Sequence, residues 1–384
     1  MKVLLTNIWL ENYAGTQLYI RDLAIALHRH GHDVEVYSPQ IGAVARKIRK
    51  AGVRVVDSTR DLINVPDVIH AQHFIPAVDA ILRFPGVPVI YFLHSRFYIG
   101  DIPPKHSQVV KYVAVDHNCL DRLIVTNMIP GNNTTVIRNW VDTETFPLRE
   151  DRPATPLRAV VFSNYAKSDN YYKIVRAACL KAGLEVDGIG YYLNKVETAP
   201  EKVIGRYDIV FAKAKAAMEA MATGAAVIVC DANGLAETVT TSNFDYFRKL
   251  NFGAKTLSRP VEVSSLIAEI KKYDLTENLR VAHRIREEAS FDRTFKTIFE
   301  LYGEAIAEYA SGVGQNKTSD GRTLAFHSRF RQRHMSRLRI RGRLEKLKDA
   351  VKDFDADFSG GMITGVIKPA YHRVFNIIGS LSDR

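Results

Sequence analysis

Short strand-like runs alternate with helical patterns along most of this 384-residue chain. Each run is rich in Val, Ile and Tyr and is bounded by Gly, Pro, Asp or Asn, and apolar residues at steps of three and four follow it, as at Ile20, Leu23 and Leu27. This alternation predicts βαβ units and a parallel sheet. We expect an α/β fold with strands in residues 3–7, 33–37, 67–70, 88–93, 112–115, 157–162, 185–189, 208–211 and 226–229.

The alternation stops in a polar segment, residues 141–156, which carries three prolines and is typical of a linker. We therefore expect two Rossmann-like domains, residues 1–150 and residues 151–292. A crossover helix, residues 293–312, and a basic tail, residues 313–384, complete the predicted organisation. Because ligands of open parallel sheets bind outside the carboxyl ends of the strands, the binding site is expected in the cleft between the domains.

The net charge of +11 is concentrated in the tail, because residues 322–348 contain ten Lys or Arg and one acid, Glu345. The tail also carries two apolar stripes, in residues 340–358 and 363–381. A basic amphipathic helix of this kind suits an anionic membrane surface, a homo-oligomer, or packing against the body of the protein. Binding of nucleic acid by the tail is disfavoured, since only Phe326 and Phe330 are interleaved with the basic residues and no nucleic-acid-binding motif precedes them.

Three scattered cysteines, Cys119, Cys179 and Cys230, argue for a reducing compartment and against a disulfide or zinc framework. The first residues become polar too quickly for a signal peptide, and nothing approaches the roughly 20 apolar residues of a transmembrane helix. We expect a cytoplasmic protein that attaches peripherally to the inner face of the cell membrane or assembles through residues 322–384.

Residues 207–237 are the most informative stretch for function. They predict a strand, a helix rich in small residues, a glycine stop, a second strand and a glycine-bearing loop at residues 234–237. Small residues let a ligand approach the helix N-terminus, where free N–H groups and the helix dipole favour an anion. Glu219, in the first turns of this helix, can accept two hydrogen bonds from a vicinal diol such as ribose. The combination suits a nucleotide diphosphate.

Several segments together resemble the family 4 glycosyltransferases of the GT-B fold, over residues 1 to about 310. The glycine loop Asn12-Tyr-Ala-Gly-Thr-Gln is followed by a helix and by His30-Gly-His-Asp-Val-Glu-Val-Tyr-Ser-Pro. The family's later signatures are similar to residues 67–73, 89–94, 136–146 (with Trp140 in a glycine position), 219–227 and 234–237.

The resemblance implies transfer of a sugar from a nucleotide-diphosphate sugar to an acceptor hydroxyl, with retention and without a metal or another cofactor. It implies that residues 1–150 form the acceptor-side domain and that residues 151–292 form the nucleotide-sugar-binding domain. A lipid-linked acceptor or an envelope glycan fits the basic tail. The resemblance implies that Gly15 and Thr16 bind the diphosphate, that Glu219 holds the ribose, and that His94 contacts the donor sugar or its leaving group. It also implies weaker roles for Lys167, Gly234, Ser163, Asn164 and His73.

Lys213 and Lys215 flank the start of the glutamate helix, and a lysine there could stabilise the leaving diphosphate as a point charge. Lys213 is the favoured candidate, with a solvated loop lysine as the alternative. Two departures from the family pattern stand out: Phe211 occupies the place of a usual first glutamate, and residues 162–173 offer no aligned arginine. These departures leave two alternatives: a non-catalytic nucleotide-sugar-binding scaffold, and an epimerase or phosphorylase on the same fold.

Overall fold

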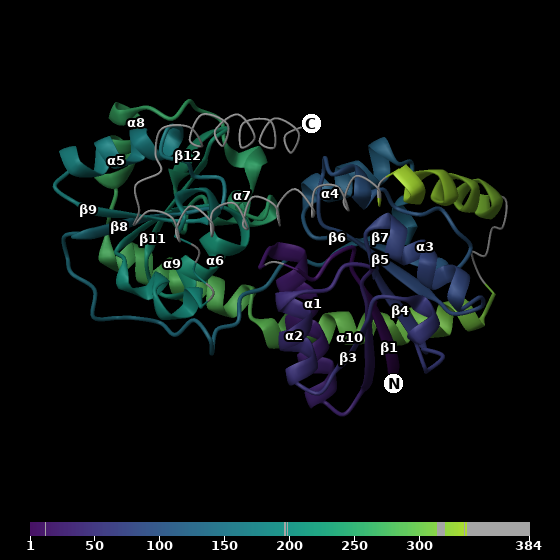
Figure 1. Ribbon diagram of the computed structural model, residues 1–384. Helices are drawn as coiled ribbons and strands as arrows, with labels where there is room; N and C mark the ends of the chain where they lie inside the picture. The colour runs from purple at the N-terminus through teal and green to yellow at the C-terminus, as the bar shows by residue number, and fades with distance from the viewer. Residues whose placement is uncertain (12, 196, 198, 313–318, 334, 336–384) are drawn as a thin grey trace, which may run out of the picture. The chain divides into compact units, whose positions relative to one another are not determined.

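The computed structural model describes residues 1–11, 13–195, 197, 199–312, 319–333 and 335. The chain forms two compact units, residues 1–317 and residues 318–384, and each is described by itself. The first unit holds two β-sheets with helices between their strands (Figure 1), as the alternating sequence pattern predicts. Short 3₁₀ turns fill several of the connections.

The first sheet has seven parallel strands in the order β3-β2-β1-β4-β5-β6-β7. The strands are β1 (Lys2–Thr6), β2 (Asp33–Tyr37), β3 (Arg54–Val56), β4 (Val68–Gln72), β5 (Val89–Leu93), β6 (Val109–Ala114) and β7 (Thr134–Val136). The helices of this N-terminal half are α1 (Gly15–Arg29), α2 (Ala43–Lys50), α3 (Phe74–Arg83) and α4 (His117–Asp121).

The second sheet has five strands in the order β12-β11-β10-β8-β9. They are β8 (Arg158–Phe162), β9 (Glu185–Ile189), β10 (Ile209–Ala212), β11 (Ala226–Asp231) and β12 (Gly234–Thr238). All pair in parallel except β12, which runs antiparallel to β11. The helices of this C-terminal half are α5 (Tyr171–Lys181), α6 (Ala214–Ala222), α7 (Phe244–Lys249), α8 (Val263–Ile270) and α9 (Leu275–Glu288).

The predicted fold class, α/β with two Rossmann-like parts, is confirmed, and a strand is present at each of the nine predicted places. One local prediction was wrong: residues 234–237 belong to strand β12 and are not a loop. The chain turns back tightly after Asp231, and Gly234 pairs with Asp231 in the resulting hairpin. The short strands β3 and β7 were also missed, because three residues carry too little periodicity.

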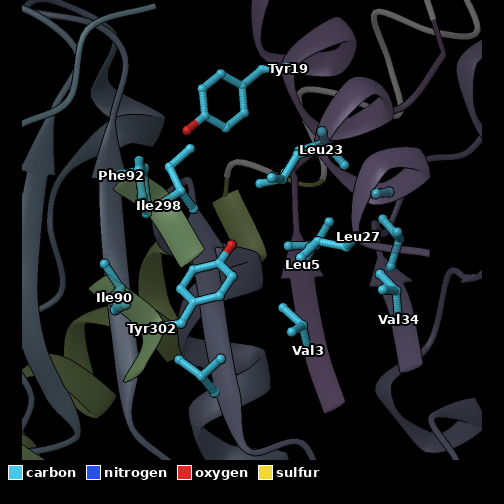
Figure 2. Close-up of a cluster of buried hydrophobic side chains, with 14 of the residues drawn as sticks. Val3, Leu5, Tyr19, Leu23, Leu27, Val34, Ile90, Phe92, Ile298 and Tyr302 are labelled. Carbon is cyan, nitrogen blue, oxygen red and sulfur yellow. The ribbon is translucent and has the colours of Figure 1, made fainter. Parts of the chain in front are cut away.

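Helix α10 (Phe291–Ala310) follows the C-terminal half but packs against β4, β5 and β6 of the first sheet. Figure 2 shows Val3 and Leu5 of β1 facing Leu23 of α1, with Ile298 and Tyr302 of α10 beside β5. The sequence dictates this arrangement, because the central parallel strands are apolar on both faces and need a helix layer on each.

The two chain crossings between the sheets lie side by side. The N–H of Val141 donates to Ala289 O at 2.8 Å, and the N–H of Phe291 donates to Val141 O at 3.1 Å. Trp140, fully buried next to this junction, packs edge-on against Phe291. The connections are therefore tied to each other by backbone hydrogen bonds close to the cleft.

In the second unit, residues 320–333 are helical, which agrees with a helical start to the basic tail. The two apolar stripes predicted in residues 340–358 and 363–381 lie outside the described residues. Within the part of the chain that the structure describes, no helix combines the length and the apolar character that a bilayer crossing requires.

Candidate functional site

A cleft of about 610 Å³ opens at the carboxyl ends of the strands of both sheets. Its walls come from β1–α1, β5 and residues 139–146 on one side, and from β8–α5, β9 and β10–α6 on the other. The topology predicts this place, because the loops that follow parallel strands all lie at the same edge of the sheet.

Helix α1 begins at the wall of the cleft. Ala14, Gly15 and Thr16 line it, and no side chain of the described residues caps this helix end. A Cβ atom built on Gly15 would meet nothing within 4 Å, so the backbone here faces open space. The first N–H groups of an α-helix lack partners within the helix, and these groups therefore offer hydrogen bonds to a ligand anion.

Helix α6 begins at the opposite wall. Lys213 alone connects β10 to α6, and Ala214, Lys215 and Ala216 line the cleft. Ala214 has a φ of +52°, a left-handed conformation that alanine rarely adopts, and its N–H donates to Phe252 O at 2.8 Å. No side chain caps this end in the described structure either. Two positive helix ends thus face one cleft from opposite sides.

Glu219 lies one turn further along α6 and lines the same cleft. Glu219 is 6% exposed, and its Oε1 atom lies 3.8 Å from Nζ of Lys215. Burial raises the pKa of this carboxyl group to about 7, and Lys215 opposes the shift. The Glu219 carboxyl group is therefore present in both its charged and its neutral form near neutral pH.

Two lysines bring positive charge to the start of α6. The ammonium group of Lys213 contacts the buried carboxylate of Asp231 and lies over the ring of Tyr165, 5.1 Å from its centre. Lys215 lies between two carboxylates, Glu219 and Asp22. Lys213 therefore packs against its neighbours and is not a solvated loop lysine. Its charge is already paired with that of Asp231.

His94 follows β5 and lines the cleft. The backbone N–H of His94 donates to Oδ2 of the buried Asp101 at 2.9 Å. The imidazole ring packs edge-on against the ring of Tyr19, with ring centres 4.7 Å apart. The Nε2 atom is buried without a hydrogen-bond partner in the described structure. Burial lowers the pKa of His94 to about 3, so the imidazole is neutral at physiological pH.

The cleft brings together seven of the predicted site residues: Gly15, Thr16, His94, Ser163, Asn164, Lys213 and Glu219. Three others do not line it. His73 is buried near Trp9 and Tyr98, Lys167 is exposed with its ammonium over the ring of Tyr192, and Gly234 lies within β12, where a Cβ would come 2.9 Å from Arg259 O.

Phe211 does not stand where a glutamate would face the donor. It is fully buried in β10, packed in the core of the C-terminal half. Only Lys213 lies between β10 and α6, so position 211 belongs to the strand and not to a loop over the cleft. The side chain of Phe211 therefore packs in the core and does not line the cleft.

Sequence reasoning did not select several residues that line the cleft, notably Asp22 and Asn251. Asp22 lies on the second turn of α1, where the motif looked only helical. Asn251 follows α7 in a segment whose mixed polar and aromatic residues indicated a packed loop. Its one available signal was the pair Asn251-Phe252 before Gly253, a composition typical of a turn.

Comparison with known proteins agrees with this architecture. Residues 13–145 match the family model described as Glycosyltransferase Family 4. A glycosyltransferase from Rickettsia africae ESF-5 has a similar structure, with 14% identity and a TM-score of 0.59, over 79% of this chain and 98% of that one. No curated protein sequence matches the chain significantly.

Two further structures are similar. Anabaena HepE, solved in complex with UDP and glucose, shares 13% identity and a TM-score of 0.59 over 79% of this chain and 99% of that chain. A Listeria monocytogenes protein assigned as a UDP-N-acetylglucosamine 2-epimerase shares 9% identity and a TM-score of 0.50 over 82% and 98%. At such identities the likeness shows the fold. Together with the family match, it confirms the resemblance to family 4-like glycosyltransferases of the GT-B fold.

Proposed function

We propose that this protein is a glycosyltransferase that moves a sugar from a nucleotide-diphosphate sugar to an acceptor hydroxyl. One observation carries the proposal: the N-termini of α1 and α6, neither capped by a side chain in the described structure, line the same cleft. The buried carboxyl group of Glu219 lines this cleft as well. Two helix N-termini suit a diphosphate, and a carboxylate beside them suits the ribose diol.

In this proposal the N–H groups near Gly15 and Thr16 and those at the start of α6 hold the diphosphate. Lys215 and Lys213 neutralise the charge that grows on the departing diphosphate, so the chemistry requires no metal. Ser163 and Asn164, at the end of β8, offer further hydrogen bonds. His94, neutral and with Nε2 unpaired, accepts a hydrogen bond from the donor sugar.

The reaction we propose proceeds with retention at the transferred sugar, and the acceptor is an envelope glycan or a glycolipid. The Anabaena neighbour supports a sugar nucleotide as donor, because it was solved with UDP and glucose. The Listeria neighbour favours one alternative, epimerisation of a sugar nucleotide on the same fold. A non-catalytic sugar-nucleotide scaffold is the third possibility.

Thermal shifts with UDP-, GDP- and ADP-sugars test the binding step, because a ligand of the native state raises the apparent melting temperature. Turnover is then followed as release of nucleoside diphosphate with the donor that binds. The proposal expects the unchanged protein to release it, and Glu219→Ala and His94→Ala to release far less. Binding without release supports the scaffold, isomerised sugar nucleotide supports the epimerase, and phosphate-dependent turnover supports a phosphorylase.

We also propose that the basic tail, residues 322–384, holds the enzyme at an anionic membrane. Each basic residue near an anionic leaflet contributes about 1 kcal/mol, so several together suffice for reversible attachment. Co-sedimentation with anionic and neutral vesicles tests this in the full chain and in a variant with Arg329, Arg331 and Arg333 changed to Gln. Equal partitioning into both vesicles would contradict it, and a tail-dependent change in mass by light scattering would favour homo-oligomerisation.

A further inference from the structure

Asn251 presents an unused hydrogen-bond acceptor at the wall of the cleft. The residue follows α7, lines the cleft, and is 6% exposed. Its Oδ1 atom is buried and has no hydrogen-bond partner among the described residues. A buried polar atom without a partner is costly, so its persistence beside a ligand cleft calls for an occupant that completes the hydrogen bond.

The backbone fixes Asn251 in this place at a conformational cost. Asn251 has a φ of +54° and Phe252 a φ of +50°, both in the left-handed region. Asparagine tolerates this region, whereas phenylalanine does so rarely. Phe252 O accepts the hydrogen bond from the N–H of Ala214, which is also left-handed, so three left-handed residues meet where α6 begins, and two of them are strained. Strain of this kind concentrates at functional sites.

Packing keeps the turn rigid. Phe252 is fully buried and lies edge-on to Phe244, with ring centres 5.6 Å apart. Its N–H donates to Phe247 O at 2.8 Å, and the N–H of Asn251 donates to Arg248 O at 3.1 Å. The side chain of Arg248 in turn donates to Asn139 O, on the opposite side of the cleft, at 2.9 Å. The backbone that carries Asn251 is therefore held in place at the wall of the cleft.

The chemistry of the unpaired atom selects its partner. An amide oxygen only accepts hydrogen bonds, and the oxygens of a diphosphate diester carry no hydrogen at neutral pH. A sugar hydroxyl can donate. Since Ala214 contacts the Asn251 turn directly, a sugar attached to a diphosphate at the α6 N-terminus would lie next to Asn251.

We propose that Asn251 binds a hydroxyl of the transferred sugar and contributes to donor-sugar specificity; this rests on the proposed function. The geometry separates two recognition elements at the start of α6. The helix end binds the diphosphate, which is common to all donors. Asn251 accepts a hydrogen bond from the sugar, which differs between donors.

Asn251→Gly is the informative variant, because glycine accepts the left-handed conformation and removes only the amide. Asn194→Gly is the matched control, since Asn194 is also left-handed, with a φ of +55°, but is exposed and does not line the cleft. Dissociation constants are measured by calorimetry for UDP and UDP-glucose, GDP and GDP-mannose, and ADP and ADP-glucose.

We expect Asn251→Gly to raise the dissociation constant of the preferred sugar nucleotide by about threefold to tenfold, the usual effect of one lost hydrogen bond. The dissociation constant of the matching nucleoside diphosphate should change by less than about twofold. Asn194→Gly should change neither. Equal weakening of both ligands, or no change in either, would overturn the role of Asn251 while leaving the proposed function intact. Failure of the unchanged protein to bind any of the six ligands would overturn the proposed function, and this inference with it.

Discussion

The ammonium group of Lys215 lies 3.6 Å from Oδ2 of Asp22, and this ion pair links α6 to α1 across the cleft. Asp22 also contacts Arg21, whose Nη2 lies 2.5 Å from Oδ1. On its other side, Lys215 reaches Glu219 at 3.8 Å. Lys215, one of the two lysines at the start of α6, is therefore shared between two carboxylates, and an incoming anion competes with them for it.

The first prediction concerns this competition. Asp22→Asn removes one competitor and should raise the affinity for UDP, GDP or ADP, whichever binds, by about twofold to fivefold, which corresponds to the usual strength of a partly exposed ion pair. Lys215→Met should lower the affinity about tenfold or more, since it removes a charge-assisted contact to phosphate. Both constants are measured by calorimetry at low and at high salt.

A matched control is Asp121→Asn, which breaks the exposed pair between Asp121 and Lys255, 3.1 Å apart and outside the cleft lining. It should leave nucleotide affinity unchanged. If Asp22→Asn weakened binding, Asp22 would contribute to the site and would not compete with the ligand.

The second prediction follows from the pKa of Glu219, which burial raises from 4.5 to about 7. Because the folded-state pKa exceeds the unfolded one, the protonated form favours folding, and this contribution is lost as pH rises from about 4.5 to 7. A ribose diol donates to the ionised carboxylate, so ligand affinity should instead increase with pH. Between pH 6 and pH 8 the increase should reach about tenfold, in proportion to the ionised fraction.

Glu219→Gln tests both halves of this argument, because an amide does not titrate. Its affinity for nucleotide should be low and nearly constant between pH 6 and pH 8, and its melting temperature should fall less than that of the unchanged protein over pH 5–7. An affinity in Glu219→Gln that still rose tenfold would assign the titration to another group. His94 is not a candidate for it, since its pKa is about 3.

The third prediction concerns Ala214, which has a φ of +52° at the start of α6. A side chain in this region costs roughly 1 kcal/mol, whereas glycine adopts it freely but loses more entropy on folding. Ala214→Gly should therefore leave the free energy of unfolding unchanged or raise it by up to about 1 kcal/mol. Urea denaturation measures it.

Ala217→Gly is the comparison, since Ala217 is buried in the interior of the same helix. It should destabilise by about 1 kcal/mol or more, as glycine normally does within a helix. Equal losses in both variants would mean that Ala214 is not strained.

The sequence was sufficient to predict the two sheets and much of the cleft wall, because these depend on local patterns. Val89–Leu93 is apolar throughout and is followed by a polar residue, so His94 had to emerge at the end of a buried strand. Glu219 was found in the same way, from small neighbours within one helix. Each of these signals lies within about ten residues.

Asn251 and Asp22 could not be found by such reasoning, because their roles depend on contacts between distant parts of the chain. Asn251 reaches the cleft only because Phe252 O meets the N–H of Ala214. Asp22 matters only because α6 brings Lys215 to it. Phe211 is a further case, since only the strand and helix bounds show that position 211 is buried within β10 and does not line the cleft.

The last prediction concerns Arg152, whose side chain is wholly buried. Its guanidinium donates to the carbonyl oxygens of Tyr207, Gly205 and Thr223 and lies 3.7 Å from Asp208. Burial lowers the pKa of Arg152 to about 10, yet the group stays charged at neutral pH. These bonds fasten the linker, residues 141–156, to the segments that precede β10 and β11.

Arg152→Met should lower the free energy of unfolding by about 3–5 kcal/mol, because it leaves Asp208 and several carbonyl groups without their buried partner. Arg158→Met is the control, since Arg158 is 44% exposed and its ion pairs with Glu185 and Asp187 are 3.6 Å long. That change should cost no more than about 1 kcal/mol. Urea unfolding followed by fluorescence compares the two variants, and equal losses would mean that burial of Arg152 gives it no special weight in holding the linker.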